Sequence, residues 1–512
     1  MPAVIYSREQ VQAWEQLWFA AGNSSYGLMQ QAAWQMTQHI MQYIDQQILR
    51  HDSSPMQHRQ KRTGSQPQKV SIGVWCGSGN NGGDGWLVGA YLKQAGFDAW
   101  VVEIAAPQTP DAKQAKEFAQ QIGIQIYPQL NQLPDSLLNI DAIFGIGLNR
   151  AVDGVYQTAI EYFNQCTGHK IALDIPSGLN ANTGAILGIA CAVDLTLTVL
   201  AYKSGLFTGQ GKAYTGQVHL IELIPPHANL TPLAQLDLQI PVLKPRSQTG
   251  HKGTYGHVLI IGGDENMGGA AIMSAQAALA VGAGKVTLLT DSKHHTAALT
   301  RGPNMMTLGM PAISQITAEF AVKMTEGIDC IVIGMGLGRH EWGKAVWQAF
   351  LPVLENTTSI KTVVIDADGL WHLANEQTMN AKQHPHWYLT PHSGEAARLL
   401  GTDTASIESD RIAAIYTLKE KFGGHVLLKG AGSLTLDSQG LSICALGNAG
   451  MATAGMGDIL AGMAGGLLAQ LPDLALHDIV ALHAAAGDLL AQSGERGLEA
   501  PQMLEVIKRV VN

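Results

Sequence analysis

The chain has 512 residues, of which 46% are hydrophobic and 14% charged, and it carries a formal net charge of −9. This length exceeds what one compact core usually holds, so we expect two or three domains. The acidic balance and the absence of a Lys/Arg stripe exclude a general nucleic-acid binder. The first twenty residues lack the apolar core of a signal peptide. A membrane-spanning helix needs about 20 apolar residues, and no apolar run here is that long. We therefore expect a cytoplasmic protein with no membrane partner.

Apolar residues recur at three- and four-residue steps within residues 8–50, which predicts two helices. Residues 51–69 are polar and rich in turn formers, which predicts a solvated loop. Strands are predicted at residues 70–76, 99–103, 141–145, 170–175 and 193–200, and helices lie between them near 111–123 and 157–166. This alternation predicts a parallel, doubly wound sheet with its ligand at the carboxyl ends of the strands.

A glycine-rich segment, Gly77–Gly85 (GSGNNGGDG), follows the first of these strands. It contains the pattern G-x-G-x-x-G, and Glu103 ends the next strand, where the ribose partner of a dinucleotide would lie. An NAD-dependent dehydrogenase is one interpretation. The motif alone is weak evidence, however, and the side chains of Asn80 and Asn81 could instead coordinate a hard cation or orient a polar ligand.

Two further turns follow strands in this half, Gly145–Leu148 and Asp174–Gly178. Because the carboxyl ends of parallel strands lie at one edge of a sheet, we expect them to meet Gly77–Gly85 in one pocket. Asp174 is the best-placed carboxylate for proton transfer there. Its alternative role is to form the turn before Pro176.

Five prolines between residues 225 and 245 predict a connector, after which a second α/β unit begins. Its predicted strands are residues 257–262, 285–290, 330–334, 362–366, 387–390 and 425–429. Glycine-rich or polar turns follow most of them. The fold class expected for the whole chain is therefore α/β, with two doubly wound domains.

The segment Gly447–Gly462 (GNAGMATAGMGDILAG) leads into an apolar helical pattern. Its glycines allow backbone N–H groups to approach a ligand closely, and a helix N-terminus favours phosphate. Asp458 stands where this helix begins, so it either caps the helix or acts as a base on a hydroxyl beside a nucleotide phosphate. We favour the base, which indicates a small-molecule kinase arrangement.

These motifs together resemble the bifunctional NAD(P)H-hydrate repair enzymes. The first half is similar to their N-terminal epimerase domain, a Rossmann-like three-layer fold, through Asn80–Gly85 and Asp174–Leu179. The second half is similar to their ribokinase-like, ADP-dependent dehydratase domain. The motifs that carry this second likeness are Gly262–Gly263, Gly334–Gly338, Thr390–Glu395, Lys429–Ser433 and Asn448–Gly462.

The resemblance implies an epimerase domain over residues 1–224, a linker over 225–245 and a dehydratase domain over 246–512. The first would interconvert the R and S hydrates of NADH and NADPH, and the second would use ADP to dehydrate the S hydrate, releasing AMP and phosphate. It also implies a potassium ion in the first domain and a magnesium ion with ADP in the second. We further expect a homo-oligomer.

The resemblance also implies the site residues. Asp174 and Asp458 would be catalytic. The epimerase substrate would contact Asn80, Asn81, Gly82, Gly83, Asp84, Gly145, Ile146, Gly147, Leu148, Asn149, Arg150, Ala151 and Asp174, and potassium would be held by Asn81, Asp141 and Ser177. The dehydratase substrate would contact Ala270, Gly336, His392 and Asp458, and the nucleotide would contact Lys429, Gly430, Ala431, Gly432, Ser433 and Gly457.

This chain departs from the family pattern at two turns. The kinase turn, usually GGTGD, reads Ala454–Asp458 (AGMGD) here, so the thioether of Met456 replaces a threonine hydroxyl, and Met335 replaces the usual proline of the other turn. A non-catalytic nucleotide sensor and a ribokinase-type kinase fused to a nucleotide-binding domain are the competing interpretations. Retention of Asp174 and Asp458 argues against the sensor.

Overall fold

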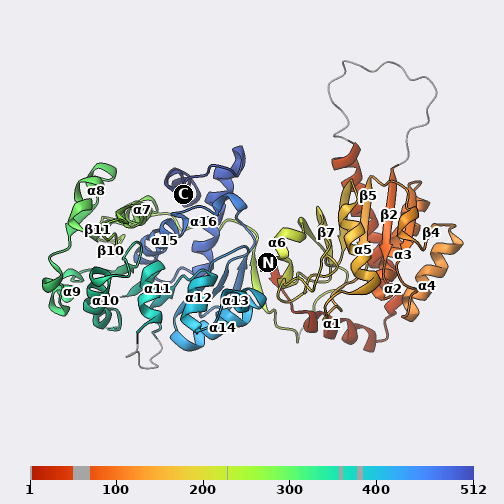
Figure 1. The fold of residues 1–512 in the computed structure, drawn as a ribbon, viewed down its shortest axis with the longest axis horizontal. Helices are drawn as coiled ribbons and strands as arrows, with labels where there is room; N and C mark the ends of the chain where they lie inside the picture. Colours follow the sequence, from red (N-terminus) through yellow and green to blue (C-terminus); the bar gives the residue numbers. More distant parts are fainter. Residues whose placement is uncertain (1–2, 50–69, 228, 357–360, 377–383) are drawn as a thin grey trace, which may run out of the picture. The chain divides into compact units, whose positions relative to one another are not determined.

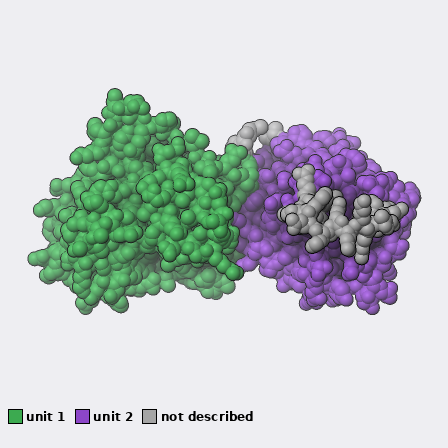
Figure 2. All heavy atoms as spheres, turned by 90° about the horizontal axis from the view of Figure 1, so that it is seen from above, with its two compact units in different colours: residues 1–3, 234–512 green, residues 4–233 purple. Residues whose placement is uncertain are grey.

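The computed structural model describes residues 3–49, 70–227, 229–356, 361–376 and 384–512. The predicted polar loop at 51–69 lies outside the described residues. The chain divides into two compact units, an N-terminal unit of residues 4–233 and a C-terminal unit of residues 1–3 and 234–512, purple and green in Figure 2. No helix in the described ranges is long and apolar enough to cross a membrane.

The N-terminal unit alternates strands and helices along most of its length (Figure 1). After β1 (Ala3–Ile5), its elements are α1 (Arg8–Ala20), α2 (Ser25–Tyr43), the π-helix Ile44–Leu49, β2 (Ser71–Cys76), α3 (Asn80–Gln94), β3 (Asp98–Glu103), α4 (Pro110–Gln121), β4 (Gln125–Tyr127), β5 (Leu138–Ala142), α5 (Gly154–Gln165), β6 (His169–Leu173), β7 (Leu195–Val199), α6 (Gly211–Tyr214) and β8 (Gln217–Ile221).

Its seven strands form one parallel sheet in the order β4-β3-β2-β5-β6-β7-β8. Apolar side chains of α2, α3 and α4 pack on one face of the sheet, and those of α5 pack on the other. The predicted doubly wound α/β architecture is therefore confirmed. It brings the carboxyl ends of β2, β5 and β6 to one edge.

Gly82, Gly83 and Gly85 of the first motif lie inside α3, because the helix begins at Asn80, and Gly77 and Gly79 precede it. A Cβ on Gly82 would lie 2.0 Å from the carbonyl oxygen of Gly77, and one on Gly85 would lie 2.5 Å from the Cβ of Ala142. These glycines therefore allow α3 to pack closely on the end of β2 and on β5. Sequence reasoning assigned them to a ligand turn alone.

The C-terminal unit contains a larger sheet. Its elements are β9 (Ala234–Asp237), β10 (His257–Ile261), α7 (Gly268–Ala280), β11 (Lys285–Thr290), α8 (His295–Arg301), β12 (Met306–Gly309), α9 (Ala318–Met324), β13 (Cys330–Ile333), α10 (Glu341–Leu354), β14 (Thr362–Ile365), α11 (Ala367–Ala374), β15 (Trp387–Leu389), α12 (Ser393–Leu400), α13 (Thr404–Ser409), α14 (Arg411–Phe422), β16 (His425–Leu428), β17 (Leu434–Leu436), β18 (Leu441–Cys444), α15 (Met456–Gln470), α16 (Leu476–Leu490) and α17 (Met503–Val510).

Its strands run in the order β9-β18-β17-β16-β15-β14-β13-β10-β11-β12. Apolar residues of α7, α15, α16 and α17 form one core with the sheet, and α10 to α14 lie on the opposite side in Figure 1. The strands from β12 to β16 are parallel, as predicted, whereas β17 is antiparallel to both β16 and β18. Three- and four-residue strands such as these leave too little pattern to predict.

Two sequence predictions need correction. The strand expected at 141–145 runs from Leu138 to Ala142, and the polar Asn139, buried within it, hid its start. Asn139 accepts a hydrogen bond from the indole of Trp75. The proline-rich connector expected at 225–245 also contains β9, which pairs with β18 in the C-terminal sheet.

Candidate active sites

A buried ion pair lies at the carboxyl edge of the N-terminal sheet. Asp174 directly follows β6 and adopts a positive φ of 65°, a conformation that a non-glycine residue rarely holds. Its Oδ1 lies 2.6 Å from Nζ of Lys203, and its Oδ2 accepts a hydrogen bond from the amide of Ile146. Asp174 is thus held on both oxygens, one of them by the predicted Gly145–Ala151 segment.

Lys203 is a residue of this site that sequence reasoning missed. Its side chain is fully buried, and its ammonium also donates to the hydroxyl of Thr198 and to the carbonyl oxygen of Val199. All three ammonium protons are therefore used, and the pair with Asp174 offsets the burial of the charge. The only signal in the sequence was a lysine four residues after the strand that ends at Val199.

The charge of Asp174 acts on two further carboxyl groups. Burial and the charge of Asp174 raise the pKa of Glu15, on α1, to about 7. Burial, followed by the charges of Asp174 and Glu15, raises the pKa of Asp84 well above its usual value. Asp84 belonged to the predicted substrate segment, whereas Glu15 did not. The cluster therefore combines a salt-bridged aspartate with carboxyl groups that favour the protonated form.

The three predicted potassium ligands lie close to this pair. Asp141 accepts bonds from the hydroxyl and the amide of Ser177, at 2.6 and 2.7 Å. Neither polar atom of the buried Asn81 side chain has a hydrogen-bond partner. A Cβ on Gly145 would lie 3.0 Å from Oδ2 of Asp174 and 3.4 Å from the Cβ of Asn81. The structure thus brings Asn81, Gly145 and Asp174 together, with Asp141 and Ser177 paired nearby.

The dehydrogenase interpretation required the carboxylate of Glu103 to bind a ribose. In the structure Glu103 instead pairs with Lys116 of α4, with 2.6 Å between Nζ and Oε1.

The rest of the predicted 145–151 segment, from Gly147 through Asn149 and Arg150 to Ala151, is largely exposed and irregular.

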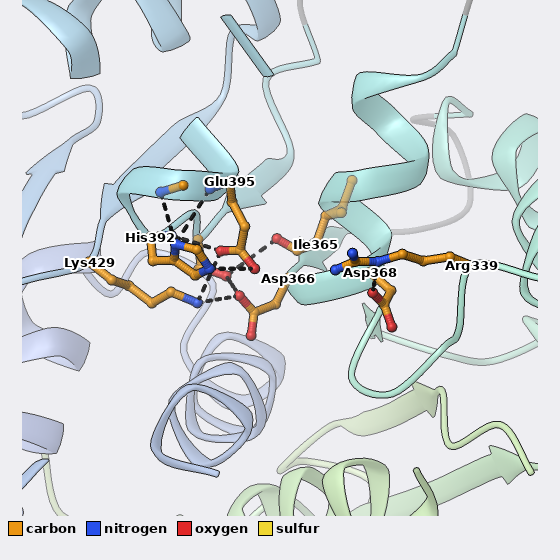
Figure 3. Close-up of polar contacts among 9 residues, drawn as sticks. Arg339, Ile365, Asp366, Asp368, His392, Glu395 and Lys429 are labelled. Carbon is orange, nitrogen blue, oxygen red and sulfur yellow. Dashed lines mark hydrogen bonds and ion pairs between the residues drawn. The ribbon is translucent and has the colours of Figure 1, made fainter. Parts of the chain in front are cut away.

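A second carboxylate–lysine pair lies at the carboxyl edge of the C-terminal sheet (Figure 3). Asp366 directly follows β14 and Lys429 directly follows β16, and Nζ of Lys429 lies 2.6 Å from Oδ1 of Asp366. The same oxygen accepts a bond from the hydroxyl of Thr390, and Glu395 lies 3.7 Å from the ammonium. Burial lowers the pKa of Lys429, but the charges of Asp366 and Glu395 raise it above its usual value.

His392 reaches this cluster from the N-terminus of α12. Its Nδ1 accepts hydrogen bonds from the amides of Gly394 and Glu395, so the imidazole caps the helix. Its main chain forms a parallel bridge with Lys429, and its exposed ring turns Nε2 toward Glu395, 3.5 Å from Oε1. His392 therefore has a structural role together with a ring nitrogen next to the cluster.

Asp458 lies in the first turn of α15 but does not cap it. Gly455 is the N-cap and no side chain bonds to the first amides, so the capping alternative is wrong. A Cβ on Gly457 would lie 3.5 Å from Nζ of Lys429 and 3.7 Å from Oδ2 of Asp366, which places the start of α15 on the ion pair. Burial and the charge of Asp366 raise the pKa of Asp458 to about 7. A carboxyl group in this range is suited to accept a proton at neutral pH.

Two glycines of the segment Gly447–Gly462 use their amides within the protein. The amide of Gly447 donates to Asp488 of α16, and that of Gly450 donates to the side chain of Asn448. They shape the loop rather than bind an anion. The side chain of Met456, which replaces the usual threonine, is buried in the apolar core.

Ala270 and Gly336 meet at the start of α7. A Cβ on Gly336 would lie 2.5 Å from the carbonyl oxygen of Met267, which also accepts the amide of Ala270. The amide of Gly338 in the same turn donates to Asp368, whose charge contributes to the raised pKa of Asp458. Asp368 also pairs with Arg339 at 2.7 Å (Figure 3).

The predicted nucleotide loop follows Lys429 directly. The hydroxyl of Ser433 bonds to the carbonyl oxygen of Gly430 and accepts from its amide, so the loop from Lys429 through Ala431 and Gly432 closes on itself. Sequence reasoning identified this loop but assigned no role to Asp366, Asp368 or Glu395. The signal available for Asp366 was its position directly after a strand of β-branched residues.

Comparison with known proteins covers both units. Residues 258–509 match the family described as NAD(P)H-hydrate dehydratase, and residues 25–205 match the family described as YjeF-related protein N-terminus. The bifunctional NAD(P)H-hydrate repair enzyme of Escherichia coli is 38% identical over 86% of this chain and 84% of its own. The corresponding enzyme of Coxiella burnetii is 37% identical over 87% and 91%.

A solved structure of an ADP/ATP-dependent NAD(P)H-hydrate dehydratase from Bacillus subtilis, co-crystallised with ATP and Mg²⁺, is also similar. It covers 54% of this chain and 98% of its own at 26% identity, with a TM-score of 0.45.

Proposed function

The chain belongs to the family of bifunctional NAD(P)H-hydrate repair enzymes, and we propose that it repairs hydrated NADH and NADPH with two separate sites. The N-terminal site interconverts the R and S hydrates, and the C-terminal site dehydrates the S hydrate with ADP. We assign the epimerase domain to residues 1–224, the linker to 225–245 and the dehydratase domain to 246–512. We also propose that the protein acts in the cytoplasm as a homo-oligomer.

One observation carries this proposal. Each unit places a buried aspartate–lysine pair at the carboxyl edge of its own sheet, Asp174–Lys203 in one and Asp366–Lys429 in the other, both at 2.6 Å. Beside the C-terminal pair lie Gly457, at the start of α15, and the loop from Lys429 that Ser433 closes on itself. An anionic nucleotide therefore fits the second site, and the held carboxylate of Asp174 suits proton transfer in the first.

In the N-terminal site, Asp174 is the group that moves a proton at the hydrated carbon. Lys203 and the amide of Ile146 hold its carboxylate, and Asp84 lies in the first turns of α3. We propose that the hydrate contacts Asn80 to Asp84 and Gly145 to Ala151. Epimerisation leaves the composition of the substrate unchanged, so this site consumes no nucleotide.

The residues expected to hold potassium fit such an ion. The side-chain oxygen of Asn81 is buried without a partner, and burial raises the pKa of Asp141, so an adjacent cation would satisfy one group and favour the ionised form of the other. Ser177 adds a third oxygen donor, the ligand type that hard cations prefer. When bound, the ion would fix Asn81 and supply positive charge near the hydrate.

In the C-terminal site, Asp458 accepts the proton of the hydrate's hydroxyl while that oxygen attacks the terminal phosphorus of ADP. The bond from this phosphorus to the bridging oxygen breaks and AMP leaves. The carbon–oxygen bond of the phosphorylated hydrate then breaks and releases phosphate, while the neighbouring carbon loses a proton and the electrons of that carbon–hydrogen bond form the ring double bond. Lys429, Gly457 and the loop to Ser433 hold the nucleotide, and Ala270, Gly336 and His392 border the hydrate.

The acidic groups of this site also fit a magnesium ion. Asp366 and Asp368 supply carboxylate oxygens near Asp458, and magnesium is commonly held by one or two carboxylates together with substrate phosphates. When bound, the ion would neutralise phosphate charge.

The test uses a hydrate of both epimers and follows the return of the near-ultraviolet absorbance of the reduced nicotinamide ring. The full chain is expected to restore all of the absorbance when ADP is supplied, and ATP supplied separately measures nucleotide preference. No return of absorbance with either nucleotide, in well-folded protein with potassium and magnesium present, would contradict the proposed function.

A further inference from the structure

A buried arginine under the C-terminal site has no role in the proposed chemistry. Arg411, the first residue of α14, has a side chain that is only 1% exposed. One terminal nitrogen donates to the hydroxyl of Ser393 at 3.1 Å and to Glu408 at 2.9 Å. The other donates to the carbonyl oxygens of Leu428 and Lys429, at 3.1 and 3.2 Å.

These bonds join the carboxyl ends of two neighbouring strands. Ser393 follows His392 just beyond β15, and Lys429 follows Leu428 at the end of β16. Both ends carry residues assigned to ligands. A planar guanidinium can bind the two sides with a fixed geometry, which a lysine ammonium cannot reproduce.

The guanidinium also supports the loop that follows Lys429. A Cβ on Gly430 would lie 2.8 Å from both terminal nitrogens of Arg411, and Gly430 has a φ of 152°. The main chain of Lys429 and Gly430 therefore rests directly on the guanidinium. Movement of this support would displace the ammonium of Lys429 together with the closed loop to Ser433.

We propose that Arg411 is a positioning residue for nucleotide binding, which fixes the Lys429–Ser433 loop without touching the ligand. The inference rests on the proposed use of that loop for ADP. The four bonds described above hold the loop and the end of β15 and do not reach Asp458. The effect of Arg411 therefore falls on nucleotide affinity rather than on the chemical step.

A purely structural ion pair with Glu408 is the alternative explanation. Glu408 is 36% exposed and accepts only one of these four bonds, so the loop carbonyls do not depend on its charge. The variant Glu408→Gln keeps a carbonyl oxygen at that position and removes the charge. It is therefore the matched control for Arg411→Lys, which keeps the positive charge and removes the planar guanidinium.

The experiment measures kcat and KM for ADP in S-hydrate dehydration, together with ADP affinity by calorimetry. In Arg411→Lys we expect KM and Kd for ADP to rise about tenfold or more, because two bonds to the loop carbonyls are lost, while kcat at saturating ADP stays within about threefold. Glu408→Gln is expected to keep KM within about threefold. Epimerisation by the N-terminal unit should be unchanged in both.

An unchanged KM for ADP in folded Arg411→Lys, or a loss confined to kcat, overturns the inference. A KM that rises equally in Glu408→Gln also overturns it, because the ion pair would then be responsible. If Arg411→Lys does not melt cooperatively, Ser393→Ala replaces it. That variant removes the hydroxyl that accepts from Arg411 and donates to Glu408, and it should raise KM for ADP about threefold. An unchanged KM there refutes the inference. Failure of the wild type to bind ADP refutes the proposed function as well.

Discussion

Asp458→Asn should make the C-terminal unit more stable at neutral and alkaline pH while abolishing dehydration. Burial and the charge of Asp366 raise the pKa of Asp458 to about 7, against 3.8 for the unperturbed group. The substituted asparagine would have a similar shape but no charge to bury. The wild type holds this unfavourable carboxylate because the proposed chemistry needs a base there.

The size of the effect follows from the two pKa values. An acid whose pKa is raised by folding binds its proton more tightly in the folded state, so the wild type loses stability as pH rises from about 4 to about 7. The difference of about three pKa units corresponds to about 4 kcal/mol at pH 8, at about 1.4 kcal/mol per unit. At about 2 °C per kcal/mol, the Tm of a unit of this size should rise by about 8 °C.

Differential scanning calorimetry of the two proteins at pH 4.5 and pH 8 measures this change. The variant and the wild type should unfold at similar temperatures at about pH 4.5, and the variant should unfold later at about pH 8. A Tm difference that is the same at both pH values would falsify the reasoning, because a pH-independent change reports packing rather than ionisation.

Three further predictions concern activity and packing. The kcat for dehydration should fall below pH about 7 by up to tenfold per pH unit, because Asp458 accepts a proton only when ionised; a flat profile from pH 5.5 to 8.5 contradicts this role. Lys203→Met should slow R-hydrate epimerisation by about 10² or more without changing S-hydrate dehydration, as measured with separated epimers. Gly85→Ala should lower the unfolding free energy of the N-terminal unit by about 1–3 kcal/mol in urea, since its methyl would meet Ala142 at 2.5 Å. The control Gly79→Ala, which meets nothing within 4 Å, should cost less than about 0.5 kcal/mol.

Most strands of the two parallel arrays were predicted because buried strands are continuous apolar runs, whereas the parallel strands β4, β8 and β12 were not predicted. The strand predicted at 285–290 matches β11, and most others differ by one or two residues at an end. The start of β5 was missed because Asn139 is polar yet buried. The strand β9 was missed because four residues among prolines carry no periodic pattern.

The sequence pointed to the glycine-rich segments and to Asp174 and Asp458, because close backbone approach requires glycine and proton transfer requires an ionisable side chain. The residues that pair with these aspartates and with Lys429 could not be predicted from the sequence. Lys203, Asp366 and Glu395 lie in segments that follow three different strands, and only the folded sheets bring them beside Asp174 or Lys429. Sequence reasoning also treated glycine as a sign of ligand contact, whereas Gly82 and Gly85 serve the packing of α3.

The account's central claim is that two sites divide the repair reaction, and Asp174→Asn tests it most directly with a mixture of both epimers and saturating ADP. The variant should repair the S hydrate at the wild-type rate and then the R hydrate only as fast as it epimerises spontaneously, giving two phases of absorbance recovery. Asp458→Asn should block both phases. If Asp174→Asn slows the S hydrate as much as the R hydrate in well-folded protein, the proposed division of labour is wrong.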